Sequence, residues 1–406
     1  MDSDTHRVEK LNAGIAPIFE PGLEALLRKN LASGRLAYTS DLSEGVRDAD
    51  CVIFTYDTPV DANDELDLTP IIVAAEEIAR YLRQDTLVVV QSQVPVGTCE
   101  KLGHLLRRMK PTRAPAIACV PENLRLGEAI SRFMEPTMLV IGADETSTLD
   151  RADAFLSIVP GARLRTNLKT AEMTKHALNA FFATCISFAN ELGNLCDEIG
   201  ADGFKVAEAM RLDERIGPRA LVRPGAPFGG GTLARDLRIL KGVGHAAGYE
   251  TPLIDAVFRV NEEQKDLVVK RLRQLFGELR GLSIGVLGLT YKAGTSTLRR
   301  SQALDIIHRL TGVGAVVKAY DPKADLSELG TTSLFQMCVN AYEAADGADA
   351  VVIATEWPEF RELDFARLRS RLRRPVILDA KNLLDPEALA HAGFVYLGIG
   401  RGTKPG

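Results

Sequence analysis

The chain has 406 residues, of which 46% are hydrophobic and 25% are charged, a balance typical of a globular protein with more than one domain. Its 49 basic and 54 acidic residues give a net charge of −5, which argues against a nucleic-acid-binding or membrane-binding surface. No apolar run approaches the roughly 20 residues that span a bilayer, and the polar start Met1-Asp2-Ser3-Asp4 does not resemble a signal peptide. We therefore expect a cytoplasmic protein.

The first part of the chain alternates strand and helix patterns. Apolar runs, most of them rich in β-branched residues, predict strands at 51–55, 86–91, 116–120 and 137–141. Helical patterns at 70–83 and 100–109 separate these strands, and another at 21–30 precedes them. Continuous apolar strands separated by helices are typical of a parallel sheet covered on both faces. The sequence therefore predicts an α/β domain over residues 1–160.

The middle of the chain, residues 161–275, is helical. From 170 to 199 the pattern runs without a glycine or proline until Gly193, which is too long for a crossover helix in a small domain. Further helical patterns follow at 203–210 and from 233 through 275. We expect a central domain whose long helix links two other domains and could supply a dimer interface.

The last part, residues 276–406, returns to the alternating pattern. Strands are predicted at 282–287, 316–319, 350–354, 375–378 and 394–397, with helices between them. The expected fold class is α/β, with two Rossmann-like doubly wound domains joined by a helical central domain.

Cysteine and histidine spacing gives no sign of a metal site or a disulfide framework. The six cysteines are scattered, most of them in apolar stretches, and no C-x-x-C pair occurs. Buried free thiols in a reducing compartment are the favoured interpretation.

Short tracts in a fixed order resemble those of the UDP-glucose/GDP-mannose dehydrogenase family and cover nearly the whole chain. They include Ile18-Phe19-Glu20-Pro21-Gly22-Leu23, Val94-Pro95-Val96-Gly97-Thr98, Pro121-Glu122-Asn123-Leu124-Arg125, Phe228-Gly229-Gly230-Gly231, Leu287-Gly288-Leu289-Thr290-Tyr291-Lys292 and Gly398-Ile399-Gly400-Arg401. The resemblance implies NAD-dependent oxidation of the sugar alcohol of a UDP- or GDP-sugar toward aldehyde or uronate, by a homodimer. In that chemistry two hydrides pass to NAD, and a cysteine captures the intermediate aldehyde.

The resemblance also implies catalytic roles for four polar residues. Lys175 would stabilise the developing oxyanion and Asn179 would assist it, since an i, i+4 pair shares one helix face. Asp236 would position or activate water with the lysine, and Glu122 would take part in thioester hydrolysis. The alternatives are a lysine on a solvated helix face, an aspartate favoured near a helix N-terminus, and a glutamate that opens a turn.

Thr232 stands where the family has its nucleophilic cysteine, and Gln93 stands where it commonly has threonine. A threonine hydroxyl needs a dedicated base, whereas modest electrostatics activate a thiol. The nearest cysteines in sequence, Cys196 and Cys338, are remote. Three outcomes remain open: a single oxidation, oxidation of a hydrated aldehyde without a thiohemiacetal, or no catalysis. The corresponding alternative functions are a non-catalytic nucleotide-sugar-binding protein and an epimerase that oxidises only transiently.

Further residues are assigned to ligands by the same resemblance. Arg215 matches an arginine that reaches the substrate from the neighbouring subunit, and Lys292 and Arg299 match residues that contact substrate and cofactor. The remaining assignments are the substrate residues Phe228, Gly229 and Gly230 and the cofactor residues Thr58 and Pro59.

The start of the chain contains no G-x-G-x-x-G turn, which in a dinucleotide-binding domain holds the pyrophosphate at a helix N-terminus. Asp2 and Asp4 resemble the acidic end of the second strand, where a carboxylate binds the ribose. About 30 residues, one strand-turn-helix unit, would then be missing. The expectation is that the first domain lacks its first βα unit. Either Met1 is a mis-assigned start, which is the simpler explanation, or NAD binding is impaired.

Overall fold

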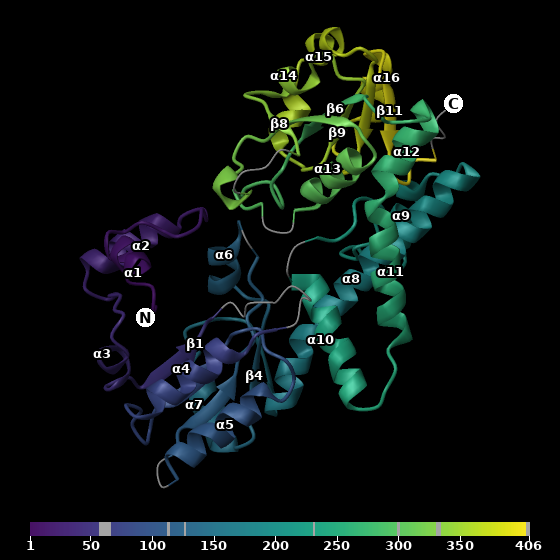
Figure 1. The fold of residues 1–406 in the computed structure, drawn as a ribbon. Helices are drawn as coiled ribbons and strands as arrows, with labels where there is room; N and C mark the ends of the chain where they lie inside the picture. The colour runs from purple at the N-terminus through teal and green to yellow at the C-terminus, as the bar shows by residue number, and fades with distance from the viewer. Residues whose placement is uncertain are drawn as a thin grey trace. The chain divides into compact units, whose positions relative to one another are not determined.

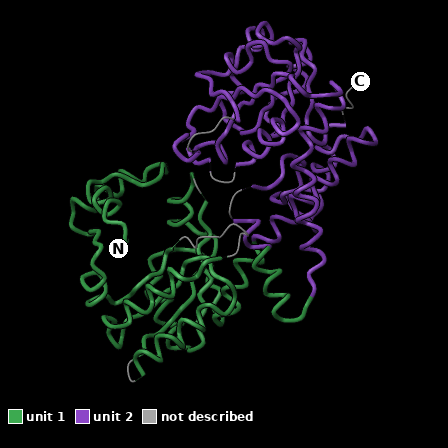
Figure 2. Tube along the Cα trace, viewed as in Figure 1, with its two compact units in different colours: residues 1–178, 238–249 green, residues 179–237, 250–406 purple. Residues whose placement is uncertain are grey.

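The computed structural model describes residues 1–56, 66–111, 114–125, 127–229, 232–298, 301–329 and 334–402. These residues form two compact units, shown in green and purple in Figure 2. Unit 1 comprises residues 1–178 and 238–249, and unit 2 comprises residues 179–237 and 250–406. Among the described residues, no helix combines the length and the apolar character needed to cross a membrane.

Unit 1 contains a five-stranded sheet in the order β1-β2-β3-β4-β5. Its strands are β1 Cys51–Phe54, β2 Leu87–Val90, β3 Ala116–Cys119, β4 Met138–Gly142 and β5 Ala162–Thr166. The first four confirm the predicted strands. The sheet is parallel except between β3 and β4, which pair antiparallel through Cys119 and Gly142. The prediction of a parallel sheet is therefore wrong for this one pair.

β5 was not predicted because its sequence is polar. It lies at the edge of the sheet, and Arg163 and Arg165 extend from it to the acidic side chains of α7 Thr146–Phe155. An exposed edge strand buries too few side chains to show an apolar run.

Helices cover both faces of this sheet because side chains alternate along each strand. On one face Val88, Val90 and Phe54 pack with residues of α4 Thr69–Ala79 and α5 Thr98–Met109. On the other face Leu87 and Val89 pack with residues of α7. The remaining helices of this unit are α1 Thr5–Asn12, α2 Leu23–Ala32, α3 Leu42–Val46 and α6 Ala129–Met134 (Figure 1).

The helical middle is present as predicted. The long helix α8 extends over Leu168–Ile199. It is followed by α9 Gly203–Leu212, α10 Thr232–Ala246, α11 Pro252–Lys265 and α12 Leu267–Phe276. Both α8 and α10 contribute residues to each unit, because the unit boundaries fall after Leu178 and Leu237.

Unit 2 contains a six-stranded parallel sheet in the order β11-β10-β9-β6-β7-β8. The strands are β6 Ser283–Leu287, β7 Val316–Tyr320, β8 Gln336–Met337, β9 Ala350–Ile353, β10 Val376–Asp379 and β11 Val395–Gly398. Five were predicted, and the sixth, β8, has only two residues. The strand order reverses between β6 and β9, and in such sheets ligands bind outside the carboxyl ends of the strands at that reversal.

The two faces of this sheet are also covered. Residues of α12 and of α13 Gln302–Gly312 pack on one face against Ile284, Val286 and Val352. On the other face, Leu287, Val351 and Ile353 belong to a cluster with residues of α14 Ala341–Ala345, α15 Phe365–Arg371 and α16 Pro386–His391. Both sheets are thus doubly wound.

Candidate active site

Lys175 is buried near the start of α8, in contact with the segment that follows β3. Its Nζ donates a hydrogen bond to the carbonyl oxygen of Glu122 at 2.6 Å and lies 3.8 Å from the Glu122 carboxylate. A second, longer bond of 3.4 Å reaches Asn123 Oδ1. Only 6% of Lys175 is exposed, so it does not lie on a solvated helix face. The structure therefore brings together two of the predicted residues, an ammonium and a carboxylate, at the carboxyl end of β3.

Asn179 and Asp236 form a second buried pair, within unit 2. The Asn179 side-chain amide donates a hydrogen bond to the Asp236 carboxylate, which has no exposed surface. Asn179 lies one turn after Lys175 on α8, and Asp236 lies in the second turn of α10. A carboxylate held this way can orient a polar ligand without moving.

Thr232 is exposed at the first residue of α10. All six cysteines are free thiols, and the nearest to Thr232 in sequence are Cys196 and Cys338. Burial raises the pKa of Cys51 to about 11 and also raises the pKa of Cys185, Cys196 and Cys338. For Cys99 the pKa is raised first by its contact with Cys119 and then by burial. These groups are poor thiolate nucleophiles at neutral pH.

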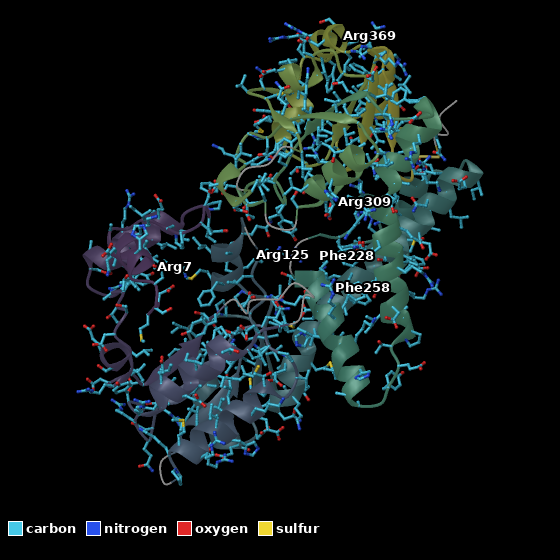
Figure 3. All side chains as sticks on the ribbon, viewed as in Figure 1. Arg7, Arg125, Phe228, Phe258, Arg309 and Arg369 are labelled. Carbon is cyan, nitrogen blue, oxygen red and sulfur yellow. The ribbon has the colours of Figure 1, made fainter. Side chains whose placement is uncertain are left out.

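Phe228 and Gly229 precede α10 in a buried segment without regular structure (Figure 3). Buried amides hold this segment: Asn190 on α8, and Asn261 and Gln264 on α11. Sequence analysis missed these residues. The available signal was polar amides in otherwise apolar helical patterns, which predicts burial but not a contact. The predicted residue Gly230 lies outside the described residues.

Of the residues expected to bind NAD, Asp2 lies in unit 1. The carboxyl end of the unit 1 sheet carries a buried polar group that lacks a partner among the described residues. Ser92, two residues after β2, has a buried hydroxyl with no hydrogen-bond partner among the described residues. The N-terminus of α5 is already occupied, because the Glu172 carboxylate accepts from Gly97 N at 2.5 Å and from Cys99 N at 2.7 Å. The residues present therefore fit a ligand along the strand ends, with Ser92 as its hydrogen-bond partner, and not at this helix.

The acidic start of the chain is not the end of a strand. The structure assigns no strand to the described residues before Cys51. Asp4 instead caps α1 by accepting from Arg7 N, and the Asp2 carboxylate pairs with the Arg7 guanidinium at 2.9 Å. Partial burial acts to raise the pKa of Asp2, but the hydrogen bonds and charge that Asp4 N and Arg7 supply to its carboxylate outweigh it and lower the pKa below its ordinary value. The predicted cofactor residues Thr58, Pro59 and Arg299 lie outside the described residues.

Asp321 joins the tract of residues 287–292 to Trp357 at the carboxyl edge of the unit 2 sheet. The Asp321 carboxylate, directly after β7, accepts from Leu289 N at 2.7 Å, Thr290 N at 2.9 Å and Trp357 Nε1 at 3.0 Å. It thereby fixes the turn after β6 that leads to Lys292. Lys292 is half-buried and has no polar partner among the described residues.

Arg215 is exposed and pairs with Asp213 of its own chain at 2.7 Å. Among the described residues the structure gives it no contact with the other predicted site residues.

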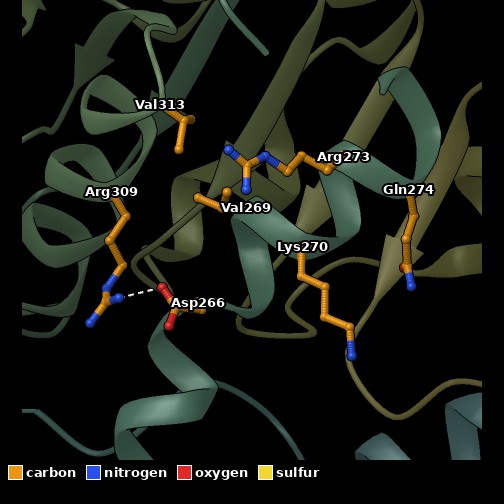
Figure 4. A pocket seen from close by; sticks show the side chains of 7 residues that line it. All are labelled: Asp266, Val269, Lys270, Arg273, Gln274, Arg309 and Val313. Carbon is orange, nitrogen blue, oxygen red and sulfur yellow. Dashed lines mark hydrogen bonds and ion pairs between the residues drawn. The ribbon is translucent and has the colours of Figure 1, made fainter. Parts of the chain in front are cut away.

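A separate cavity of about 580 Å³ lies in unit 2, and none of the residues that line it is a predicted site residue (Figure 4). Its lining includes Lys270, Arg273 and Arg309, and Arg309 pairs with Asp266. Arg273 and Arg309 lie in the last turns of α12 and α13, where cations complement the helix dipoles. The helix dipoles therefore account for the positive charges of Arg273 and Arg309 without a ligand.

Comparison with known proteins matches three domain models of one family: the UDP-glucose/GDP-mannose dehydrogenase NAD binding domain at residues 1–157, central domain at 169–263 and UDP binding domain at 285–386. Among curated proteins, UDP-glucose 6-dehydrogenase TuaD of Bacillus subtilis is 36% identical over 411 residues, covering 100% of this chain and 89% of the relative. UDP-glucose 6-dehydrogenase of Pseudomonas aeruginosa is also 36% identical, covering 99% of this chain and 91% of the relative.

Among solved structures, a UDP-glucose dehydrogenase from Pyrobaculum islandicum superimposes with a TM-score of 0.88 at 31% identity, covering 98% of this chain and 90% of that one. The agreement extends over the whole chain in both sequence and fold. The chain therefore belongs to the UDP-glucose/GDP-mannose dehydrogenase family and is an NAD-dependent nucleotide-sugar dehydrogenase.

Proposed function

We propose that this protein oxidises the primary alcohol of a UDP-sugar to the aldehyde and does not pass through a cysteine-bound intermediate. The observation that carries the proposal is a contrast within the predicted catalytic set. Lys175 and Glu122, like Asn179 and Asp236, are held in buried or half-buried polar pairs, whereas the position expected to hold a thiolate is Thr232. The groups for the first oxidation are thus retained, and the group for the covalent step is absent.

In the proposed reaction the alcohol loses a proton from oxygen and a hydride from carbon, which gives an aldehyde, NADH and a proton. NAD supplies the hydride acceptor. Lys175 and Asn179, one turn apart on α8, are the donors that stabilise negative charge as it develops on the alcohol oxygen. Their burial excludes water, so each hydrogen bond is stronger than it would be in solution. Asp236 orients the Asn179 amide by accepting from it.

UDP-sugars are the proposed substrate class, and UDP-glucose is the first to test. The support is the family's UDP binding domain over residues 285–386 and the names of the relatives. In the proposed arrangement Lys292, Phe228 and Gly229 contact the substrate. We also propose the three-part division into residues 1–160, 161–275 and 276–406, which the three matched family domains support.

We further propose a homodimer formed through α8. The side chains of Phe181, Phe188, Leu195 and Ile199 are exposed and recur at intervals of seven, seven and four residues, which places them along one side of the helix. An apolar stripe of this length is typical of an interface between copies of a chain. In such a dimer the exposed Arg215 would be available to the neighbouring subunit.

The test is the number of NADH molecules formed per UDP-glucose by wild type and by Thr232→Cys, with Thr232→Ser as the control for side-chain size. We expect one NADH and an aldehyde from wild type and Thr232→Ser, and two NADH and a carboxylate from Thr232→Cys. Two NADH per sugar from wild type would refute the single oxidation and indicate a hydrated-aldehyde route. No NADH, with UDP-glucose binding retained in calorimetry, would indicate a binding protein.

A further inference from the structure

The segment from Pro224 to Phe228, which leads into the glycine loop, is held almost entirely by side-chain amides. It is buried or half-buried and contains no helix or strand. Each of its carbonyl oxygens accepts from the side-chain amide of a residue distant in sequence. The donors, in order along the segment, are Asn382, Gln264, Asn190, Gln302 and Asn261.

Two of these amides bind the segment through both of their ends. Asn261 accepts from Phe228 N at 2.8 Å and donates to Phe228 O at 3.2 Å. Asn190 accepts from Gly225 N at 2.8 Å and donates to Ala226 O at 3.1 Å. A donor and an acceptor on one planar group fix the orientation of the backbone, which a single hydrogen bond does not. Asn190 and Asn261 are 1% and 4% exposed, so little water competes for these bonds.

The amides come from two different parts of unit 2. Asn190 lies on α8, and Asn261 and Gln264 lie on α11. Gln302 begins α13 and Asn382 follows β10, so both belong to the C-terminal sheet region. The Gln302 carboxamide oxygen also accepts from Lys381 Nζ at 3.0 Å.

Every buried backbone segment needs hydrogen-bond partners, so these hydrogen bonds do not by themselves indicate a function. The position of the segment in the chain does. It ends at Phe228, directly before Gly229, and α10 with Asp236 begins at Thr232. The amides bind both the N–H and the carbonyl of Phe228, so they set the position of this residue and of Gly229, which follows it.

We propose that Asn190 and Asn261 are positioning residues that hold Phe228, and with it the adjoining Gly229, in the place where the sugar binds, with Gln264, Gln302 and Asn382 supporting them. The proposal rests on the proposed function, because it takes Phe228 and Gly229 as residues that contact the sugar.

The experiment compares Asn261→Leu and Asn190→Leu with Ser187→Ala as a matched control. Ser187 is also buried on α8 and donates to Val257 O of α11 at 3.1 Å, so its loss removes a hydrogen bond between the same two helices without affecting the loop. Hydrogen exchange of the peptide over residues 224–232 is measured together with kcat and the KM values for UDP-glucose and NAD. Asn261→Asp is the milder variant, since its oxygen still accepts from Phe228 N.

We expect both leucine variants to increase exchange in this peptide and to lower kcat, each by about tenfold, with the KM for NAD unchanged. Asn261→Asp should change both in the same direction by a smaller factor, and Ser187→Ala should change neither. Unchanged exchange in the asparagine variants, or equal losses in Ser187→Ala, would overturn the proposal. If wild type turns over no UDP-sugar, the proposed function fails, and the exchange data still decide whether the amides hold the segment from Pro224 to Phe228.

Discussion

Replacing Gly400 with alanine tests how closely three parts of unit 2 pack together. A Cβ on Gly400 would lie 2.5 Å from Cγ of Pro224, and one on Gly193 in α8 would lie 2.3 Å from Cβ of the same proline. Pro224 is thus in close contact with two glycines, which also lie next to each other. The proline ring is rigid and its carbonyl is bound by Asn382, so it cannot rotate away as a flexible side chain would.

The expected loss of stability has two parts. Gly400 has a φ of +71°, which costs an alanine about 1–2 kcal/mol. The contact with Pro224 adds about 1–3 kcal/mol for overpacking. Gly347, in the same unit, has a φ of +66° but no neighbour within 4 Å, so Gly347→Ala carries the backbone strain alone. Gly400→Ala should therefore be less stable than Gly347→Ala by about 1–3 kcal/mol.

The assay is urea unfolding of the two variants and wild type, followed by circular dichroism. A third variant, Gly193→Ala, meets Pro224 without a positive φ, so the double variant Gly193→Ala/Gly400→Ala should not be additive, because both new methyl groups displace one proline. Equal stabilities of Gly400→Ala and Gly347→Ala would refute the reasoning, because the only difference assigned to them is the contact with Pro224.

The remaining predictions concern the catalytic lysine, one buried carboxylate and the proposed dimer. Lys175→Met removes the ammonium that contacts Glu122, and we expect NADH formation in a single turnover to slow by about 10²–10³-fold; a rate within tenfold of wild type would contradict its role. Burial raises the pKa of Asp379, so the native state binds this proton more readily than the unfolded chain, and the stability it contributes is lost as pH rises through the native pKa. The unfolding free energy of Asp379→Asn relative to wild type should therefore increase with pH above the ordinary aspartate value of 3.8, and a difference that does not vary with pH would contradict the raised pKa. Phe188→Asp places a charge in the apolar stripe of α8 and should yield monomers in sedimentation velocity, whereas the exposed-surface control Glu198→Gln should not; a dimeric Phe188→Asp variant would exclude this interface.

Elements whose pattern is local were predictable from the sequence. The predictions agree with β1, β2 and α8, which were expected at 51–55, 86–91 and 170–199. In each of these elements the buried side chains follow the spacing of a strand or a helix, and this spacing is visible in the sequence. β5 was missed because it is a polar edge strand. β8 was missed because a strand of two residues is too short to show an alternation of polar and apolar side chains. The antiparallel pairing of β3 with β4 has no local signature, since an apolar strand reads alike in either direction.

The residues of the candidate site also fall into those that the sequence indicated and those that it did not. Lys175 is buried and contacts Glu122, which excludes the solvated helix face that the sequence left open for it, and the catalytic roles of the two residues stay predictions. Asn190 and Asn261 could not be assigned, because their partners lie 35 and 33 residues away and the contacts exist only once α8 and α11 have packed. Buried amides in apolar helices are detectable from sequence, but the backbone they bind is determined by tertiary structure.

The consequence of Thr232 follows from acidity. At the first residue of α10 the partial positive charge of a helix N-terminus lowers the pKa of a thiol enough to populate the thiolate at neutral pH. The same field acts on a threonine hydroxyl, whose pKa is far higher, so the hydroxyl stays protonated and needs a base. The nearest carboxylate in sequence is Asp236, which already accepts from Asn179. Any second oxidation must therefore begin from a hydrated aldehyde, with water in place of the thiol. The Thr232→Cys variant changes only the nucleophile and leaves this buried pair intact, so a gain of the second NADH in that variant would locate the difference at residue 232.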